Sequence, residues 1–326
     1  MKKVLIAILL LGLLPHASAD YIHWVDFRLS APVLRSALEL DMASQGGEQP
    51  LDWIDILALA AAWRGGTGVT VADTQRAAQA LRGDTPPERL PGMAGRYFSY
   101  YREAYGAALG GLAGHFAIRR TDPQTGEAEW IPAYGLKAFS PIAAGYPWLH
   151  YPDFGAQRSY GYARPHLGND ILGALGTPIC AVEGGTVEAL GWNQYGGWRI
   201  GIRSDDRKRY YYYAHLRKDT PYAEGLAVGQ RVQAGEVIGF MGRTGYSAQE
   251  NVNNIETVHL HFGLQLIFDE SQKECDSEIW IDVYPIIELL ASHCSSVARD
   301  PQTGRWERLY PYCDLDAEPL RSAAAR

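Results

Sequence analysis

The sequence predicts an α+β protein of two domains, in which a helical N-terminal domain precedes a mostly antiparallel β domain. Residues 20–118 carry helix caps and apolar helical patterns, whereas residues 160–285 carry short apolar segments separated by glycine turns. The 326 residues suffice for two cores, and 47% hydrophobic with 21% charged residues is typical of a globular protein. We expect a signal peptide at 1–19, a helical accessory domain at 20–135, a linker at 136–160, a β domain at 161–293 and a tail at 294–326.

The first residues are typical of a secretory signal. Lys2 and Lys3 form a basic start, residues 4–14 are apolar, and residues 17–19 form a small-residue cleavage site. The apolar run is shorter than the roughly 20 residues that span a bilayer, and no second run of spanning length follows. An uncleaved anchor is the less favoured alternative. We therefore expect a mature chain that begins near Asp20 and works outside the cytoplasm, in the periplasm or cell-wall compartment.

The charge balance is acidic. The net charge is −7, and it becomes −9 when Lys2 and Lys3 are removed with the signal. An acidic surface argues against nucleic acid or an anionic membrane as partner.

Helix signals are dense in the N-terminal half. Asp52 is a candidate cap for a helix over 51–63 that stops at Gly65-Gly66. Thr70 and Asp73 suggest a capping box before a helix over 74–81. A further start is predicted at 85–88 and an aromatic helix at 97–112. The tyrosines of this last helix suit either sugar stacking or helix packing, and we favour packing.

Short strands are predicted in the second half, at residues 178–182, 186–190, 198–203, 209–215, 237–241 and 258–268. The pentapeptide Asp-Pro-Gln-Thr-Gly occurs at 122–126 and again at 300–304, and both copies indicate hairpin turns. A short helix follows Pro285, and the tail from residue 295 is predicted to be partly disordered.

Four cysteines are present. Cys294 and Cys313 flank the tail and could be joined, whereas Cys180 in an apolar run is expected to be a buried thiol; Cys275 is the fourth. Sequence alone does not choose among the three possible pairings.

Residues 258–266 form the stretch with the clearest chemistry. Apolar and polar residues alternate there, so Leu260 and Phe262 face one side of a strand while His259 and His261 face the other. Two imidazoles and a glycine on the polar face indicate a functional site.

Two earlier segments supply partners for these imidazoles. His166 and Asp170 share a face of an extended chain, and Gly168 between them leaves room. His166, Asp170 and His261 would form a zinc site with a fourth position open for water. His215 and His259 would then face the water and the substrate carbonyl.

Together these motifs resemble the lysostaphin/LytM-type zinc metallopeptidases. The shared order is His-x3-Asp, Tyr-Ala-His-Leu, Gly-x-Thr-Gly and His-Leu-His-Phe, over residues 160–285. The resemblance implies a two-sheet β fold with an open groove, one zinc ion per chain, and cleavage of peptidoglycan peptides. It implies His166, Asp170 and His261 as zinc ligands and His215 and His259 as catalytic histidines. Residues 24–27 and 109–112 are similar to the amino-terminal region of clostridial-type members.

One departure from this family concerns residues 246–258, a polar, Asn-rich insertion before His259. We expect it to border the groove and to alter specificity. Asn169 and Gln265 are candidates for contacts with the ligands or the substrate. Alternation puts Tyr211, Tyr213 and His215 on one face of a strand, and Tyr211 and Tyr213 either line the groove or pack.

Three other functions compete with a zinc peptidase. A non-catalytic LytM-like module that binds cell wall or activates another hydrolase would usually lack metal ligands, and all five positions are present here. A structural or adhesion protein is supported only by the exposed aromatic residues. A cysteine amidase is disfavoured because no cysteine has the Gly-rich helix-start context of a nucleophile.

Overall fold

The computed structural model describes residues 21–122, 124–160, 162–273, 275 and 277–317. The predicted signal at 1–19 lies outside the described residues. No helix in the described part of the chain is both long and apolar enough to cross a membrane.

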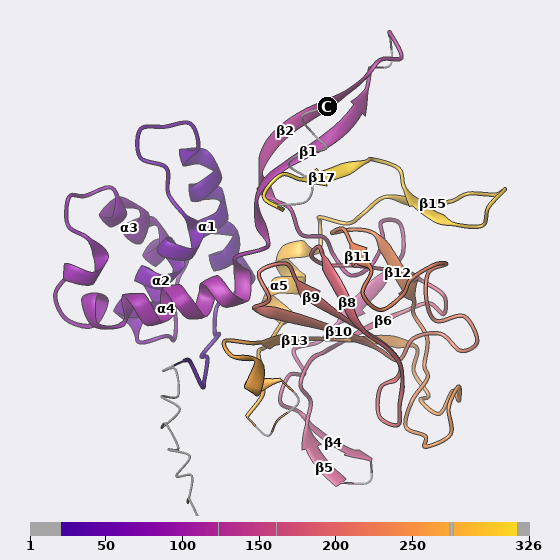
Figure 1. Ribbon diagram of the computed structural model, residues 1–326. Coiled ribbons are helices and arrows are strands. Elements are labelled where there is room, and N and C mark those ends of the chain that lie inside the picture. Colours follow the sequence, from indigo (N-terminus) through magenta and orange to yellow (C-terminus); the bar gives the residue numbers. More distant parts are fainter. Residues whose placement is uncertain (1–20, 123, 161, 274, 276, 318–326) are drawn as a thin grey trace, which may run out of the picture.

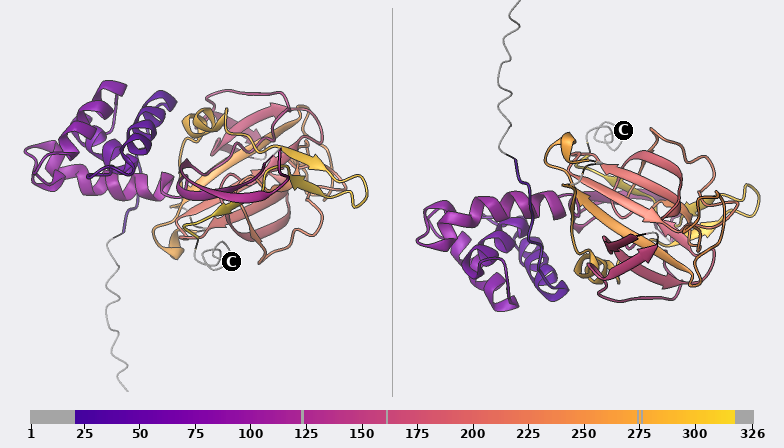
Figure 2. Two further views of the ribbon diagram at one scale, coloured as in Figure 1. Left: turned by 90° about the horizontal axis from the view of Figure 1, so that it is seen from above. Right: turned by 90° about the horizontal axis from the view of Figure 1, so that it is seen from below.

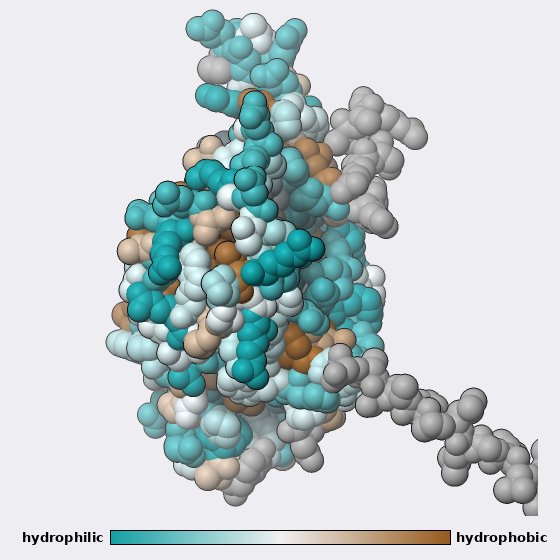
Figure 3. Space-filling view, turned by 90° about the vertical axis from the view of Figure 1, so that its left-hand side faces the viewer, coloured by the Kyte–Doolittle hydropathy of each residue, from teal (hydrophilic) through white to brown (hydrophobic). Residues whose placement is uncertain are grey.

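The N-terminal half contains helices α1 (Ala31–Ser44), α2 (Trp53–Arg64), α3 (Val71–Leu81), the 3₁₀ turn η1 (Pro87–Arg89) and α4 (Met93–Leu109). They form one group beside the β part (Figures 1 and 2). Their outer face is largely hydrophilic, with small hydrophobic spots (Figure 3).

The helix ends match the sequence signals at two of three places. Asp52 accepts a hydrogen bond from the N–H of Ile54, and left-handed Gly65 ends α2. Thr70 and Asp73 form the predicted capping box of α3. The start predicted at 85–88 yields only the turn η1, because Leu90 precedes a proline and is held extended.

The aromatic residues of α4 pack inside the helical part, as favoured from the sequence. Phe98, Tyr101 and Tyr105 are buried, and Tyr105 meets Phe27 edge to face with ring centroids 5.8 Å apart. The hydroxyl of Tyr100 donates to the backbone oxygen of Trp24. Tyr97 and Tyr100 are half-buried and pack against the same core.

A three-stranded sheet forms where the sequence predicted the end of the helical region and part of the tail. Within the range 20–135, β1 (Ala113–Thr121) and β2 (Ala128–Leu136) form an antiparallel hairpin. The tail supplies β17 (Tyr312–Asp314), which pairs with β1, so residues 312–314 are ordered (Figure 1). Local sequence signals missed this strand because its partner lies far away in the chain.

The two predicted turns are built alike. Asp122 and Asp300 each accept hydrogen bonds through the side chain from the N–H groups two and three residues later. The first turn joins β1 to β2, and the second joins β15 (Val297–Arg299) to β16 (Trp306–Arg308). Both hairpin predictions are confirmed.

The main sheet has the order β11-β8-β9-β10-β13-β6-β3, with β14 also paired to β13. Its strands are β3 (Trp148–His150), β6 (Asn169–Gly173), β8 (Gly185–Asn193), β9 (Gly197–Ser204), β10 (Arg209–Ala214), β11 (Arg231–Val232), β13 (His259–Leu266) and β14 (Ile279–Trp280). Their ladders are antiparallel. Strand β3 lies in the predicted linker 136–160, so part of that segment forms the edge of the sheet.

Two small sheets and a helix complete the β part. One sheet pairs β7 (Pro178–Cys180) with β12 (Val237–Phe240), and the other pairs β4 (Gln157–Tyr160) with β5 (Tyr162–Pro165). The 3₁₀ turn η2 (Glu270–Gln272) follows β13, and α5 (Tyr284–Leu290) is the short helix expected after Pro285. The fold is thus helical at the N-terminus and mostly antiparallel β thereafter.

A buried arginine joins the helical part to the main sheet. Arg209 of β10 is ion-paired to Glu183 at 2.7 Å and donates to the backbone oxygen of Ala107, in the last turn of α4, at 2.7 Å. A cation at this end of a helix also satisfies carbonyls that have no partner within the helix. Gly111 is required beside this pair, because an added Cβ would lie 1.7 Å from Glu183 Oε1.

All four cysteines are free thiols. Cys180 is fully buried, as predicted, and burial raises its pKa to about 12. The possible bridge between Cys294 and Cys313 is not formed.

Candidate metal centre and catalytic groove

Three of the predicted residues converge on one point. His166 Nε2 lies 3.0 Å from Asp170 Oδ1 and 2.8 Å from His261 Nδ1, and His261 Nδ1 lies 3.2 Å from Asp170 Oδ1. These residues offer three ligand atoms within 4.8 Å of one another. Two imidazole nitrogens and one carboxylate oxygen in this arrangement suit a tetrahedral ion that keeps one position open.

Strand pairing brings these ligands together. Asp170 of β6 lies opposite His261 of β13 in register, and His166 sits in the loop after β5. Gly168 makes room for the ring, because an added Cβ would lie 2.7 Å from His261 Cε1 and 2.7 Å from the backbone oxygen of Phe262. The predicted role of Gly168 is therefore steric clearance at the ligand.

The two other histidines stand beside this cluster. The ring centroids of His215 and His259 are 4.7 Å apart, and those of His215 and His261 are 5.9 Å apart. His215 Nδ1 lies 2.9 Å from the backbone oxygen of Thr244, and His259 Nδ1 lies 2.9 Å from that of Thr257. These contacts favour the tautomer with Nδ1–H as donor, which leaves Nε2 of each ring as the acceptor nitrogen; Nε2 of His259 lies 3.7 Å from Asp170 Oδ1.

His215 reaches this position through an unusual backbone conformation. Simple alternation placed His215 on the same face as Tyr211 and Tyr213, and this expectation is wrong. His215 has φ +61°, so the chain leaves the strand geometry just after β10. Tyr211 and Tyr213 are buried, while Tyr212 and His215 line the groove. Left-handed backbone at a non-glycine residue is strained and frequently marks a functional position.

All five residues open into one groove of about 880 Å³. Its floor includes Tyr210 and Tyr212 of β10, and Trp280 of β14 lies over Gly263. The insertion forms part of its wall, through Tyr246, Asn254, Ile255, Glu256 and Thr257. The expectation that the insertion borders the groove is therefore confirmed.

The sequence profile of peptidase family M23 matches residues 164–274, the stretch that carries all five of these residues. The chain contains a family M23 peptidase domain.

The M23 domain is similar to several endopeptidases. It is 41% identical over 111 residues to the L-Ala–D-Glu endopeptidase of Bacillus subtilis, covering 34% of this chain and 32% of that protein. It is 38% identical over 98 residues to the glycyl-glycine endopeptidase ALE-1 of Staphylococcus capitis, covering 30% and 24%. The chain thus matches about a third or less of the length of these curated relatives.

Solved structures of this kind are also similar. A proposed glycyl-glycine endopeptidase LytM from Ruminococcus gnavus matches 82% of this chain and 91% of that chain, with a TM-score of 0.48 and 26% identity. The catalytic domain of lysostaphin from Staphylococcus simulans matches 44% and 92%, with a TM-score of 0.33 and 28% identity.

His166 is held by residues on both sides of the M23 match, most of which were not predicted from the sequence. His166 Nδ1 lies 3.1 Å from the backbone oxygen and 3.2 Å from Oδ2 of Asp153. Asn169 donates to Asp153 Oδ1 at 3.0 Å, and its own Oδ1 lies 2.6 Å from His150 Nδ1. His150 Nε2 lies 2.8 Å from Glu288 of α5. Asn169 was predicted as a supporting residue, but Asp153 and His150 fall in the predicted linker and carry no motif.

Arg158 of β4 contacts the carboxylates on both sides of His166. Its guanidinium lies 2.9 Å from Asp153 Oδ2 and 3.1 Å from Asp170 Oδ2. The Oδ1 atom of Asp170 therefore faces His166 and His261, while its Oδ2 atom is bound by Arg158. Gln265, the other predicted supporting residue, lines the groove but donates to the backbone oxygen of Gln272.

The electrostatics divide the histidines into two groups. Burial and the neighbouring His259 and His261 lower the pKa of His215 well below its ordinary value, and burial lowers that of His261. Hydrogen bonds to Asp153 and Asp170 outweigh burial and raise the pKa of His166 to about 9. His215 is therefore neutral at pH 7, whereas metal binding at His166 must displace a proton.

Proposed function

We propose that this protein is a zinc-dependent endopeptidase that hydrolyses peptide bonds of bacterial peptidoglycan. The observation that carries the proposal is the convergence of His166, Asp170 and His261 with the rings of His215 and His259, each held at Nδ1 by a backbone carbonyl, in one open groove. A site that only stabilises structure would be closed by a fourth protein ligand.

The donor set fits zinc, and we assign His166 Nε2, Asp170 and His261 Nδ1 as its ligands. Zinc held by these residues would supply Lewis acidity toward a carbonyl and a bound water. Asp153 fixes the tautomer of His166, and Arg158 fixes the orientation of Asp170. Such outer contacts are a regular feature of zinc sites that need precise ligands.

His215 and His259 are assigned to proton transfer. Each is held by a backbone carbonyl at Nδ1, so a neutral ring presents the Nε2 lone pair to the groove. One imidazole takes a proton from the attacking water as its oxygen bonds to the carbonyl carbon. The resulting imidazolium gives that proton to the amine nitrogen as the C–N bond breaks, while the second imidazole lies beside it.

The names of the relatives support a class of bond for this proposal. One acts on L-Ala–D-Glu and another on glycyl-glycine. We therefore assign stem or cross-link peptides of the cell wall as substrate, and an extracytoplasmic location in keeping with the predicted signal at 1–19.

The decisive experiment is digestion of purified peptidoglycan with the protein, with and without a chelator, followed by mass analysis of the released fragments. We expect new amine and carboxyl ends in the stem or cross-link, loss of cleavage with chelator and recovery with added zinc. The His261→Ala variant serves as the matched inactive protein. Cleavage that persists in chelator, or no cleavage by protein with stoichiometric zinc, would contradict the proposal; the latter would favour a non-catalytic module.

A further inference from the structure

Arg199 lies in the groove, in the same row of the sheet as the metal ligands. Tyr213 pairs with Ile200 of β9 and with Phe262 of β13, so the residues next to them, Arg199 and His261, flank Ala214. Directly paired residues of antiparallel strands project to the same face. Arg199, Ala214 and His261 all line the groove.

The guanidinium of Arg199 lacks a protein partner among the described residues. Its Nε is buried without a hydrogen bond, and no carboxylate in the described chain forms an ion pair with it. Arg199 as a whole is half-buried, and Nη1 of Arg203 is also buried without a hydrogen bond, so what sets Arg199 apart is that its guanidinium lacks an ion pair while the residue lines the groove. Leaving a buried guanidinium nitrogen without a partner is costly, and native proteins seldom do so without a reason. An anionic group from outside the chain would satisfy it.

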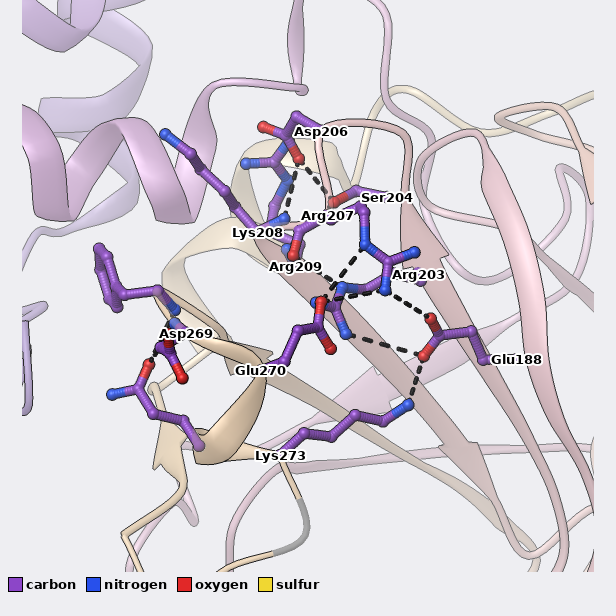
Figure 4. Close-up of polar contacts among 12 residues, drawn as sticks. Glu188, Arg203, Ser204, Asp206, Arg207, Lys208, Arg209, Asp269, Glu270 and Lys273 are labelled. Carbon is purple, nitrogen blue, oxygen red and sulfur yellow. Dashed lines mark hydrogen bonds and ion pairs between the residues drawn. The ribbon is translucent and has the colours of Figure 1, made fainter. Parts of the chain in front are cut away.

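A second arginine on the same strand shows what a structural role looks like here. Arg203 forms ion pairs with Glu270 at 2.6 Å and Glu188 at 3.7 Å, and donates to the backbone oxygen of Arg207 (Figure 4). Lys273 completes that network through Glu188 (Figure 4). The sheet thus pairs the arginine at one end of β9 and leaves the one nearer the metal ligands unpaired.

We propose that Arg199 binds a carboxylate of the peptide substrate, and that this contact selects acidic stem peptides over uncharged glycine cross-links. The inference rests on the proposed function and adds to it the substrate class. A guanidinium is suited to this task because its planar N–H groups match the two oxygens of a carboxylate.

The spacing fits a peptide that lies across the strands. Strands are about 4.8 Å apart, so the backbones of Arg199 and His261 are separated by about 10 Å. An extended peptide covers about 3.3 Å per residue, so Arg199 can meet a carboxylate about two or three residues from the scissile bond. Tyr212 is on β10, the strand between those of Arg199 and His261. Burial raises the pKa of Tyr212 and the positive charge of Arg199 opposes that rise, so Arg199 and Tyr212 interact electrostatically.

Two matched peptides are bound to zinc-loaded protein in the His215→Ala background, which is expected to keep zinc and lose turnover, and the wild-type Arg199 and its variants are compared in this background. One is L-Ala-D-Glu-L-Lys-D-Ala amide with a free glutamyl α-carboxyl, and the other has that carboxyl converted to an amide. Calorimetry should show that the His215→Ala protein binds the acid at least about 10-fold more tightly than the amide. Arg199→Gln should lose this preference because its affinity for the acid peptide falls while its affinity for the amide peptide is unchanged. Arg199→Lys should keep part of the preference.

Arg120→Gln, on the exposed β1–β2 hairpin, is the matched loss of charge and should bind both peptides as the His215→Ala protein does. Zinc content and thermal unfolding verify that Arg199→Gln is folded. Equal affinity of the His215→Ala protein for acid and amide, including no binding of either, would overturn the proposal, as would a preference that survives in Arg199→Gln. Carboxylate preference without chelator-sensitive hydrolysis by the wild-type protein would instead refute the proposed function and leave the role of Arg199 standing.

Discussion

Asp170 and His261 lie directly opposite each other on the paired strands β6 and β13, with Asp170 Oδ1 3.2 Å from His261 Nδ1. The backbone register of the sheet therefore sets the distance between two ligand atoms. Only His166 comes from a loop, and Asp153 and Arg158 hold its neighbourhood. The ligands and the proton-transfer residues occupy different positions of the fold, which makes the two sets separable by mutation.

We expect His261→Ala and His215→Ala to fail in different ways. His261→Ala removes a ligand atom and should lose both stoichiometric zinc and hydrolysis. His215→Ala leaves all three ligands and should keep zinc while kcat falls about 100- to 10,000-fold, the usual contribution of proton transfer. Zinc content by atomic emission and single-turnover hydrolysis measure the two effects. A His215→Ala protein that turns over at the wild-type rate would show that the catalytic assignment is wrong.

Asp153→Asn tests the outer contact of the metal centre. The amide is isosteric but cannot hold the His166 Nδ1–H and the Arg158 guanidinium as a carboxylate does. Zinc affinity should fall about 10- to 100-fold with all ligands present. Competition with a chromophoric chelator measures the affinity, and Asp219→Asn on an exposed loop is the control. If Asp153→Asn bound zinc as tightly as the wild type, the Asp153 carboxylate would have no role in supporting the metal ligands.

Much of this centre was predictable from sequence because local pattern and local geometry agree there. Alternation in 258–266 placed His259 and His261 on the polar face, and Leu260 and Phe262 are indeed buried on the other. The capping signals at Asp52 and Thr70 and the repeated Asp-Pro-Gln-Thr-Gly turns succeed for the same reason: each is completed within a few residues.

The features that the sequence did not predict depend on contacts between segments that are far apart in the chain. Alternation failed at His215, where one left-handed residue moves the imidazole to the face of Tyr212. Asp153 and Arg158 acquire a role only when β4 and its loop fold back over His166. Strand β17 is fixed by β1, a partner that no local propensity reveals.

Gly168→Ala should damage the centre through sterics alone. The new Cβ would lie 2.7 Å from His261 Cε1 and from the rigid backbone oxygen of Phe262, so β13 or the loop must shift. We expect about 1–3 kcal/mol of lost stability, typical of overpacking, together with weaker zinc binding. Gly106→Ala, whose Cβ would meet only Ile54 Cγ2 at 4.0 Å, should keep zinc binding and fold at least as stably. Normal zinc affinity in Gly168→Ala would refute the clearance argument.

Arg209→Met should loosen the helical part from the sheet. The substitution leaves Glu183 buried without its cation and frees the carbonyl of Ala107 at the end of α4. Breaking a buried pair in this way costs about 3–5 kcal/mol, measurable by urea unfolding. The double variant Arg209→Met/Glu183→Gln should recover part of the loss, because the buried carboxylate is gone and only the partly exposed Asp206 loses its partner. Arg120→Met on the surface is the control, and an Arg209→Met protein as stable as that control would rule out the ion pair as a major tie.

The protein stripped of zinc should lose stability as pH falls below about 6.5, the ordinary pKa of an unfolded histidine. His215 has a folded pKa well below that value, because burial and the adjacent His259 and His261 oppose its charge. Between the two pKa values the unfolded chain binds the proton and the folded chain does not, so the free energy of unfolding decreases toward acid. Each such proton corresponds to about 1.4 kcal/mol per pH unit.

His166 affects stability in a different pH range, since its raised pKa contributes stability that is lost as pH rises toward about 9. Urea titrations of wild type and His215→Gln at several pH values, over about two pH units from pH 5 to pH 7, give the free energy of unfolding of each protein. The difference between the two pH dependences isolates the contribution of His215. A smaller slope in His215→Gln supports the assignment, and equal slopes in the two proteins would exclude His215 as its source.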